Sequence, residues 1–238
     1  MERFEMTPQS AFTTTTVGAA ERVTAFLRKV YGWMFVGLGV TASVAFGVAR
    51  SPAIVEAIRA NLFLFWGLLI AELGLVFYLS ARVQRLAPNT AATLFIIYSA
   101  LNGATLSLIF LVFNLPSIAT TFLVTAGMFG ALALFGSTTR KSLAGVGQFV
   151  FMGLIGVILA SVIGMFWSNE GLQFVISVVG VIVFTGLTAW DAQRLKQMAV
   201  SLPDGQVGSY AVVGALSLYL DFINLFLFLL RFLGGRRD

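Results

Sequence analysis

Three acidic residues, Glu72, Asp191 and Asp221, stand apart because each lies within or at the edge of a long apolar stretch. The other acids fall in the polar N-terminal segment, in short polar connections or at the C-terminal end. A carboxylate in an apolar setting can exchange protons, pair with a basic side chain or ligate a hard cation. These three residues are therefore the candidates for chemistry.

Two missing residue types narrow that chemistry. The sequence contains no histidine and no cysteine, which excludes a Ser-His-Asp triad, imidazole or thiolate metal ligands, disulfides and iron–sulfur clusters. A side chain that senses pH near neutrality would therefore have to be a carboxylate.

The elements that carry these acids are predicted from composition. Hydrophobic residues make up 58% and charged residues 11% of the 238-residue chain, whereas soluble domains carry about 25% charged residues. A bilayer-spanning helix needs about 20 mostly apolar residues. The stretches that qualify are residues 29–49, 61–81, 90–113, 117–136, 147–167, 171–191 and 210–233. We therefore predict an all-α polytopic membrane protein, with a disordered N-terminal tail over residues 1–24 and a seven-helix transmembrane domain over residues 25–238.

Basic residues predict the orientation, since Lys and Arg are enriched in cytoplasmic loops. A cytoplasmic N-terminus places about twice as many of the 15 Lys and Arg residues inside as outside. This assumes that the segment 210–233 crosses the bilayer fully, whereas a re-entrant segment would keep the basic C-terminal end inside. We expect the full crossing. Because topology explains the net charge of +5, no nucleic-acid binding is indicated.

The two aspartates have different polar surroundings. Asp221 lies mid-segment, and Ser217 and Asn224 share its face of a helix. This stripe predicts a face turned toward protein or water, as a functional site or as a structural hydrogen-bond cluster. Asp191 ends the segment 171–191 close to Arg194, so an interfacial ion pair is an equally good interpretation there.

Glu72 has only apolar neighbours on its own helix, so its partner must come from another helix. Tyr98, Asn102 and Thr105 form a polar stripe that offers candidates. Such a stripe is also typical of ordinary interhelical hydrogen bonding.

The segment around Asp221 resembles a known signature. Residues 215–226 (ALSLYLDFINLF), followed by LLRF at residues 229–232, are similar to the signature of the Bax inhibitor family, also called the transmembrane Bax inhibitor motif or lifeguard family. Weaker matches are residues 188–191, 194–196 and 102–106, and Glu72 with Arg82. The resemblance spans most of the chain after the tail.

This resemblance implies seven membrane helices with the last helix at the centre of the bundle. It also implies a pH-sensitive calcium leak in which an aspartate pair, here Asp191 and Asp221, is the pH sensor and ion-binding site. A basic latch would be Arg82, with Arg85 as the less favoured register, and Glu72 would lie on the ion path. We take Ser217, Asn224 and Asn102 as supporting polar residues.

A pair of neighbouring carboxylates can act as a switch that responds to pH. Two adjacent carboxylates repel, share a proton at mild acidity and titrate as a unit. When deprotonated, they offer oxygen ligands suited to calcium and can also hold a guanidinium. We therefore expect a pH-gated, calcium-permeable leak channel in a bacterial inner membrane, without a tightly bound cofactor. Its expected partners are the lipid bilayer, calcium and protons, with a membrane protein partner as an alternative.

Buried acidic residues also occur in other functional classes of membrane protein. Presenilin-like proteases also use two intramembrane aspartates, but their Gly-x-Gly-Asp motif is missing, because Leu218, Tyr219 and Leu220 precede Asp221. We therefore expect no enzymatic activity. A proton-coupled transporter, or a non-conducting modulator of a membrane protease or channel, would use the same buried acids. No sequence feature separates these alternatives from a leak channel.

Overall fold

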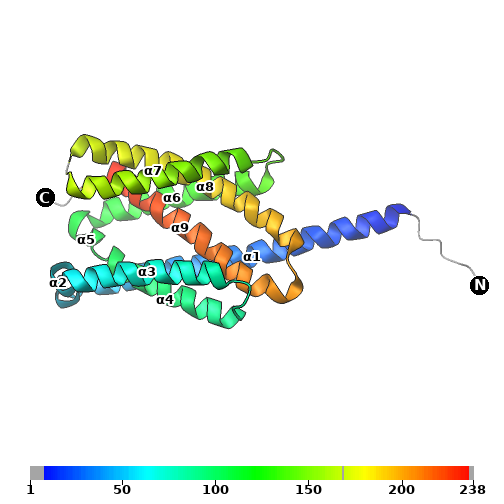
Figure 1. Ribbon diagram of the computed structural model, residues 1–238, viewed down its shortest axis with the longest axis horizontal. Helices are drawn as coiled ribbons and strands as arrows, with labels where there is room; N and C mark the ends of the chain where they lie inside the picture. Colours follow the sequence, from blue (N-terminus) through cyan, green and yellow to red (C-terminus); the bar gives the residue numbers. More distant parts are fainter. Residues whose placement is uncertain (1–7, 168, 236–238) are drawn as a thin grey trace, which may run out of the picture.

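The computed structural model describes residues 8–167 and 169–235, which form a bundle of helices (Figure 1). The helices are α1 (Pro8–Ala49), α2 (Pro52–Ala60), α3 (Leu62–Arg82), α4 (Pro88–Leu106), α5 (Ile109–Val112), α6 (Leu115–Thr138), α7 (Ala144–Phe166), α8 (Glu170–Ser201) and α9 (Val207–Leu233), with a 3-10 turn η1 (Asp204–Gln206) before α9.

The described chain contains seven segments that are long and apolar enough to cross a membrane. They are Ala20–Ala49, Leu62–Arg82, Pro88–Val112, Leu115–Thr138, Ala144–Phe166, Glu170–Ser201 and Val207–Leu233. The prediction of an all-α protein with seven membrane spans is confirmed.

Asparagine side chains cap three of these helices. Asn61, Asn114 and Asn169 each accept a hydrogen bond from a backbone amide in the first turn of α3, α6 and α8, at 2.9–3.1 Å. A cap of this kind satisfies one of the amides that a helix start leaves without a partner. Prolines stand in the first turn of α2, α4 and α6, where the missing amide hydrogen costs nothing. The turn residues in the sequence thus set the helix starts.

Helix α1 begins at Pro8, within the segment for which the sequence predicts a disordered tail. Its apolar, membrane-length part begins only at Ala20. Residues 1–7 of the predicted tail lie outside the described residues.

Helix α8 continues to Ser201, so the prediction that the sixth span ends at Asp191 is wrong. The continuation is held by packing, since Ala192, Leu195 and Ala199 are buried in the main core. Buried Gln193 also accepts a hydrogen bond from the amide of Leu143 at 2.7 Å and donates one to the carbonyl of Lys141 at 2.9 Å. These contacts tie the end of α8 to the connection between α6 and α7.

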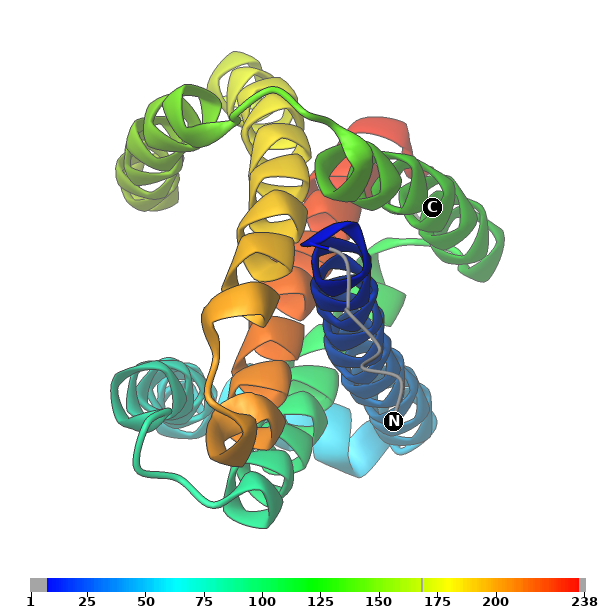
Figure 2. The ribbon, with the colours of Figure 1, turned by 90° about the vertical axis from the view of Figure 1, so that its right-hand side faces the viewer.

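Helix α9 is the central element of the bundle. It packs against α1, α4, α6 and α8, and Figure 2 shows it crossing the middle with α1 on one side and α8 on the other. In its most apolar part 67% of the residues are buried, compared with 11% in α3. The helix runs through the bundle to the end opposite the N-terminus (Figure 1), as a full crossing requires.

Glycines permit close helix contacts at two places that position the acids. A side chain at Gly136 on α6 would overlap the backbone carbonyl of Ala189 on α8, and one at Gly103 on α4 would overlap the backbone of Thr41 on α1. Helices can approach this closely only where one partner lacks a Cβ atom. The first contact fixes α8 two residues before Asp191.

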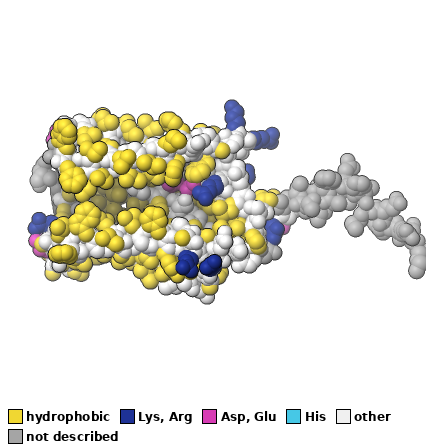
Figure 3. Space-filling view, in the orientation of Figure 1, with side chains coloured by type: hydrophobic (Ala, Val, Ile, Leu, Met, Phe, Trp, Pro, Cys, Tyr) yellow, Lys and Arg dark blue, Asp and Glu magenta, His cyan; other side chains and the backbone are white. Residues whose placement is uncertain are grey.

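The flank of the bundle is apolar. Large hydrophobic side chains such as Phe63, Phe77, Phe149 and Phe166 are between 72% and 92% exposed. Figure 3 shows hydrophobic side chains over this flank, with basic side chains mostly in the half from which α1 extends. A surface of this kind is what contact with lipid requires.

Candidate functional site

The aspartate pair lies inside the bundle, where α8 and α9 pack together. Asp191 on α8 is 7% exposed and Asp221 on α9 is 5% exposed, and the two carboxylates interact electrostatically. Ser217, one turn before Asp221, donates a hydrogen bond from its hydroxyl to Oδ2 of Asp191. The structure thus brings Asp191, Asp221 and Ser217 together at one helix contact.

Asp221 has one carboxylate oxygen without a partner. Its Oδ2 is buried and accepts no hydrogen bond from any described residue. A buried polar atom in this state is costly, so this oxygen is a favourable point for a proton or a cation to bind. No three acidic side chains gather at one point in the described chain. Calcium takes six to eight oxygen ligands, so an ion at the pair would keep water molecules.

Glu72 forms the centre of a second polar cluster. It is 8% exposed, and both of its carboxylate oxygens accept hydrogen bonds from α4. Asn102 Nδ2 donates to Oε2 at 3.0 Å, and Thr105 Oγ1 donates to Oε1 at 2.6 Å. The hydrogen-bond partners of Glu72 therefore come from the polar stripe predicted from the sequence. Because an ionised carboxylate accepts hydrogen bonds and donates none, this arrangement suits the ionised form of Glu72.

Tyr219 extends this cluster to two further helices. Its hydroxyl donates to Oδ1 of Asn102 at 2.9 Å and lies 2.6 Å from the hydroxyl of Thr41 on α1. The Thr41 hydroxyl in turn lies 2.9 Å from the carbonyl oxygen of Ser99. One hydrogen-bonded cluster therefore joins α1, α3, α4 and α9. The sequence pattern does not single out Tyr219 or Thr41 as site residues, although a tyrosine in a buried apolar helix needs a partner for its hydroxyl.

Other candidate residues are not brought to the aspartate pair. Arg82 is exposed at the end of α3, and no ion pair among the described residues joins it to either aspartate; Arg85 is likewise exposed. Asn224 donates its amide to the carbonyl of Leu220 on its own helix at 2.8 Å. Arg194 is exposed and its guanidinium lies 5.5 Å from the ring centre of Trp190, so it acts on Asp191 only through longer-range electrostatics.

Comparison with known proteins places the chain in a family. Residues 23–238 match the family described as “Inhibitor of apoptosis-promoting Bax1”. The chain belongs to the Bax inhibitor-1 family. The sequence resemblance implies seven membrane helices with the last one central. In agreement with it, seven segments of the described residues are of membrane length, and the last of them is the most buried.

Several bacterial proteins are similar to this Bax inhibitor-1 family member along most of their length. Inner membrane protein YbhL of Escherichia coli strain K12 is 49% identical over 215 residues, covering 89% of this chain and 92% of the relative. An uncharacterized protein of Borreliella burgdorferi is 44% identical over 215 residues, covering 90% and 93%. Uncharacterized protein RP147 of Rickettsia prowazekii is 41% identical over 218 residues, covering 90% of each chain. The chain is therefore an integral protein of the inner membrane type, and its orientation stays a prediction.

Proposed function

We propose that this protein is a pH-sensitive, calcium-permeable leak pathway across the bacterial inner membrane, controlled by Asp191 and Asp221. The observation that carries the proposal is the burial of both carboxylates where α8 and α9 pack together, close enough to interact electrostatically, with Oδ2 of Asp221 lacking a hydrogen-bond partner among the described residues. Membership of the Bax inhibitor-1 family supports it, because the sequence resemblance implies a calcium leak for such a pair.

Protonation would act on this pair through its charge. With both carboxylates ionised, their mutual repulsion is relieved by a divalent cation or by a guanidinium. A shared proton removes one negative charge and weakens the hold on either of them. Arg82 would compete with calcium only in a second arrangement, in which the end of α3 moves toward α8 and α9.

Glu72 would provide a second negative point on the same path. Asn102 and Thr105 hold its carboxylate by donated hydrogen bonds, which stabilise the ionised form without neutralising it. No ion pair joins Glu72 to a basic side chain in the described part of the chain. Its charge would therefore attract a permeating cation.

The test is calcium flux through purified protein in lipid vesicles that enclose a calcium-sensitive dye, measured across a pH series. The parent protein should show a pH-dependent flux, and a variant with Asp191→Asn and Asp221→Asn should lose that dependence, because amides do not titrate in this range. Glu56→Gln is the matched control, since Glu56 is an exposed acid paired with Arg59. An unchanged pH response in the double variant would overturn the mechanism.

The same measurement separates the alternatives. Saturable uptake with counterflow would identify a proton-coupled transporter, for which buried acids are equally suited. Absence of any flux at every pH would favour a modulator of another membrane protein.

A further inference from the structure

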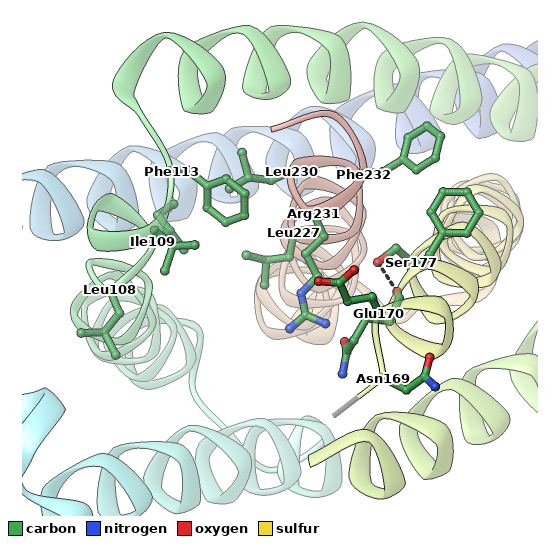
Figure 4. A pocket seen from close by; sticks show the side chains of 13 residues that line it. Leu108, Ile109, Phe113, Asn169, Glu170, Ser177, Leu227, Leu230, Arg231 and Phe232 are labelled. Carbon is green, nitrogen blue, oxygen red and sulfur yellow. Dashed lines mark hydrogen bonds between the residues drawn. The ribbon is translucent and has the colours of Figure 1, made fainter. Parts of the chain in front are cut away.

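A separate cavity lies at the end of the bundle where α9 ends and α8 begins. Its volume is about 890 Å³, and its walls come from α5 with the residues on either side of it, from the start of α8 and from the end of α9 (Figure 4). None of the three acids Asp191, Asp221 and Glu72 lines this cavity. The cavity is therefore a different site from the aspartate pair.

Two opposite charges enter this cavity from different helices. Glu170 is the first residue of α8 and Arg231 lies in the last turn of α9, and Figure 4 shows both side chains reaching into the same space. Both are exposed, and within the described residues no ion pair joins them. Their charges are therefore available to a ligand.

The rest of the lining is mostly apolar. Ile109, Phe113 and Leu227 form part of the wall. Phe174 and Phe232, which are 57% and 49% exposed, also line it and form an aromatic pair with ring centres 5.7 Å apart. Lining side chains that are this exposed show that the cavity is open to the outside of the bundle. A ligand here must be apolar on one side and charged on the other.

The position of Glu170 and Arg231 along the membrane normal also indicates a ligand with an apolar part and a charged part. Both lie at the ends of membrane-length helices, where the hydrocarbon core gives way to lipid headgroups. A planar guanidinium binds phosphate through two parallel hydrogen bonds, and a carboxylate pairs with an ammonium group. The volume lies within the range of about 300–1,000 Å³ typical of small-ligand sites, enough for a headgroup and the upper part of an acyl chain.

We propose that this cavity binds one phospholipid whose zwitterionic headgroup carries a primary amine. The lipid phosphate lies on Arg231, the ammonium group on Glu170, and the upper acyl chain on the wall formed by Phe113, Leu227 and Phe232. The site shares no residue with Asp191, Asp221 and Glu72, on which the proposed calcium pathway rests.

The test is native mass spectrometry of delipidated, purified protein titrated with phosphatidylethanolamine, phosphatidylcholine and phosphatidylglycerol. Phosphatidylethanolamine should bind about tenfold more tightly than phosphatidylglycerol, which lacks the ammonium group. Arg231→Gln should weaken all three lipids about tenfold, and Arg231→Lys should restore part of that loss. Glu170→Gln should remove the preference for phosphatidylethanolamine and leave phosphatidylglycerol binding unchanged.

Matched controls use the exposed ion pair on α2 at the same end of the bundle. Glu56→Gln and Arg59→Gln change the same charges outside the cavity and should leave all three affinities unchanged. Equal binding of phosphatidylethanolamine and phosphatidylglycerol to the parent protein would overturn the proposal. So would full binding by Arg231→Gln, or competition by soluble phosphoethanolamine at the same concentration as the lipid.

Discussion

Tyr219 shows how a single hydroxyl can join several helices in an apolar bundle. Its ring is fully buried and contacts Phe95 and Tyr98 edge-on, with ring centres 5.7 Å apart in both cases. Its hydroxyl lies between Asn102 and Thr41. Removing that hydroxyl would leave the ring in place. Asn102 and Thr41, which are both buried, would each lose one hydrogen-bond partner.

The change Tyr219→Phe should therefore lower the free energy of unfolding by about 1–2 kcal/mol, since an interhelical hydrogen bond in a membrane protein contributes about 0.6 kcal/mol on average and about 1.7 at most. Denaturation in mixed detergent, followed by circular dichroism, would measure it. Tyr78→Phe removes the same group from a half-exposed tyrosine on α3 and should have no effect. Equal losses in the two variants would contradict the role given to Tyr219.

The residues of the candidate site could be predicted in part. Glu72, Asp191 and Asp221 are recognisable because intramembrane charge is costly, so its few occurrences stand out. The hydrogen-bond partners of these residues are harder to predict, because a shared helix face does not determine which neighbouring side chain a residue contacts. Ser217 shares a face with Asp221 but donates to Asp191, and Asn224 donates to its own helix.

At the scale of the elements, the contact between α6 and α8 sets the position of Asp191. Gly136 lies directly against the backbone of Ala189, whereas Gly130, on the same helix, has open space where a Cβ atom would be. The same substitution at these two glycines therefore separates helix propensity from packing.

Gly136→Ala should destabilise the protein by about 1–3 kcal/mol, because the added methyl group must push the two helices apart. Gly130→Ala should be neutral or stabilising by up to about 1 kcal/mol, since alanine favours helix over glycine. Detergent unfolding of both variants would measure the difference. A stabilised Gly136→Ala variant would show that the close contact does not form.

The residue at which a helix ends depends on different interactions from those that predict the helix itself. Hydropathy finds the seven spans because the bilayer sets their length, but α8 continues to Ser201 through contacts that hydropathy does not report. Leu195 packs in the main core and Gln193 holds the backbone of the α6–α7 connection. Such contacts depend on the assembled bundle, so the end of this helix could not be predicted from its own residues.

For the whole molecule, the distribution of basic residues predicts a cytoplasmic N-terminus. The natural chain contains no cysteine, so a single introduced cysteine reports its own side of the membrane. Ser51 connects α1 to α2, and Ser142 connects α6 to α7. In intact cells a membrane-impermeant maleimide should label Ser51→Cys and should label Ser142→Cys only after permeabilisation, while the parent chain stays unlabelled. The reverse pattern would invert the predicted topology.

The central place of α9 has a consequence for biosynthesis. The helix that completes the interior is the last of the seven to leave the ribosome, so α1, α4, α6 and α8 enter the bilayer before a helix that all four pack against exists. Until α9 is inserted, Asp191 lacks the hydrogen bond that the hydroxyl of Ser217 donates to it, and Asn102 lacks the one from the hydroxyl of Tyr219. Chains that terminate before α9 would therefore keep unpaired polar groups within the apolar part of the membrane, where burying a polar group without a hydrogen-bond partner is costly.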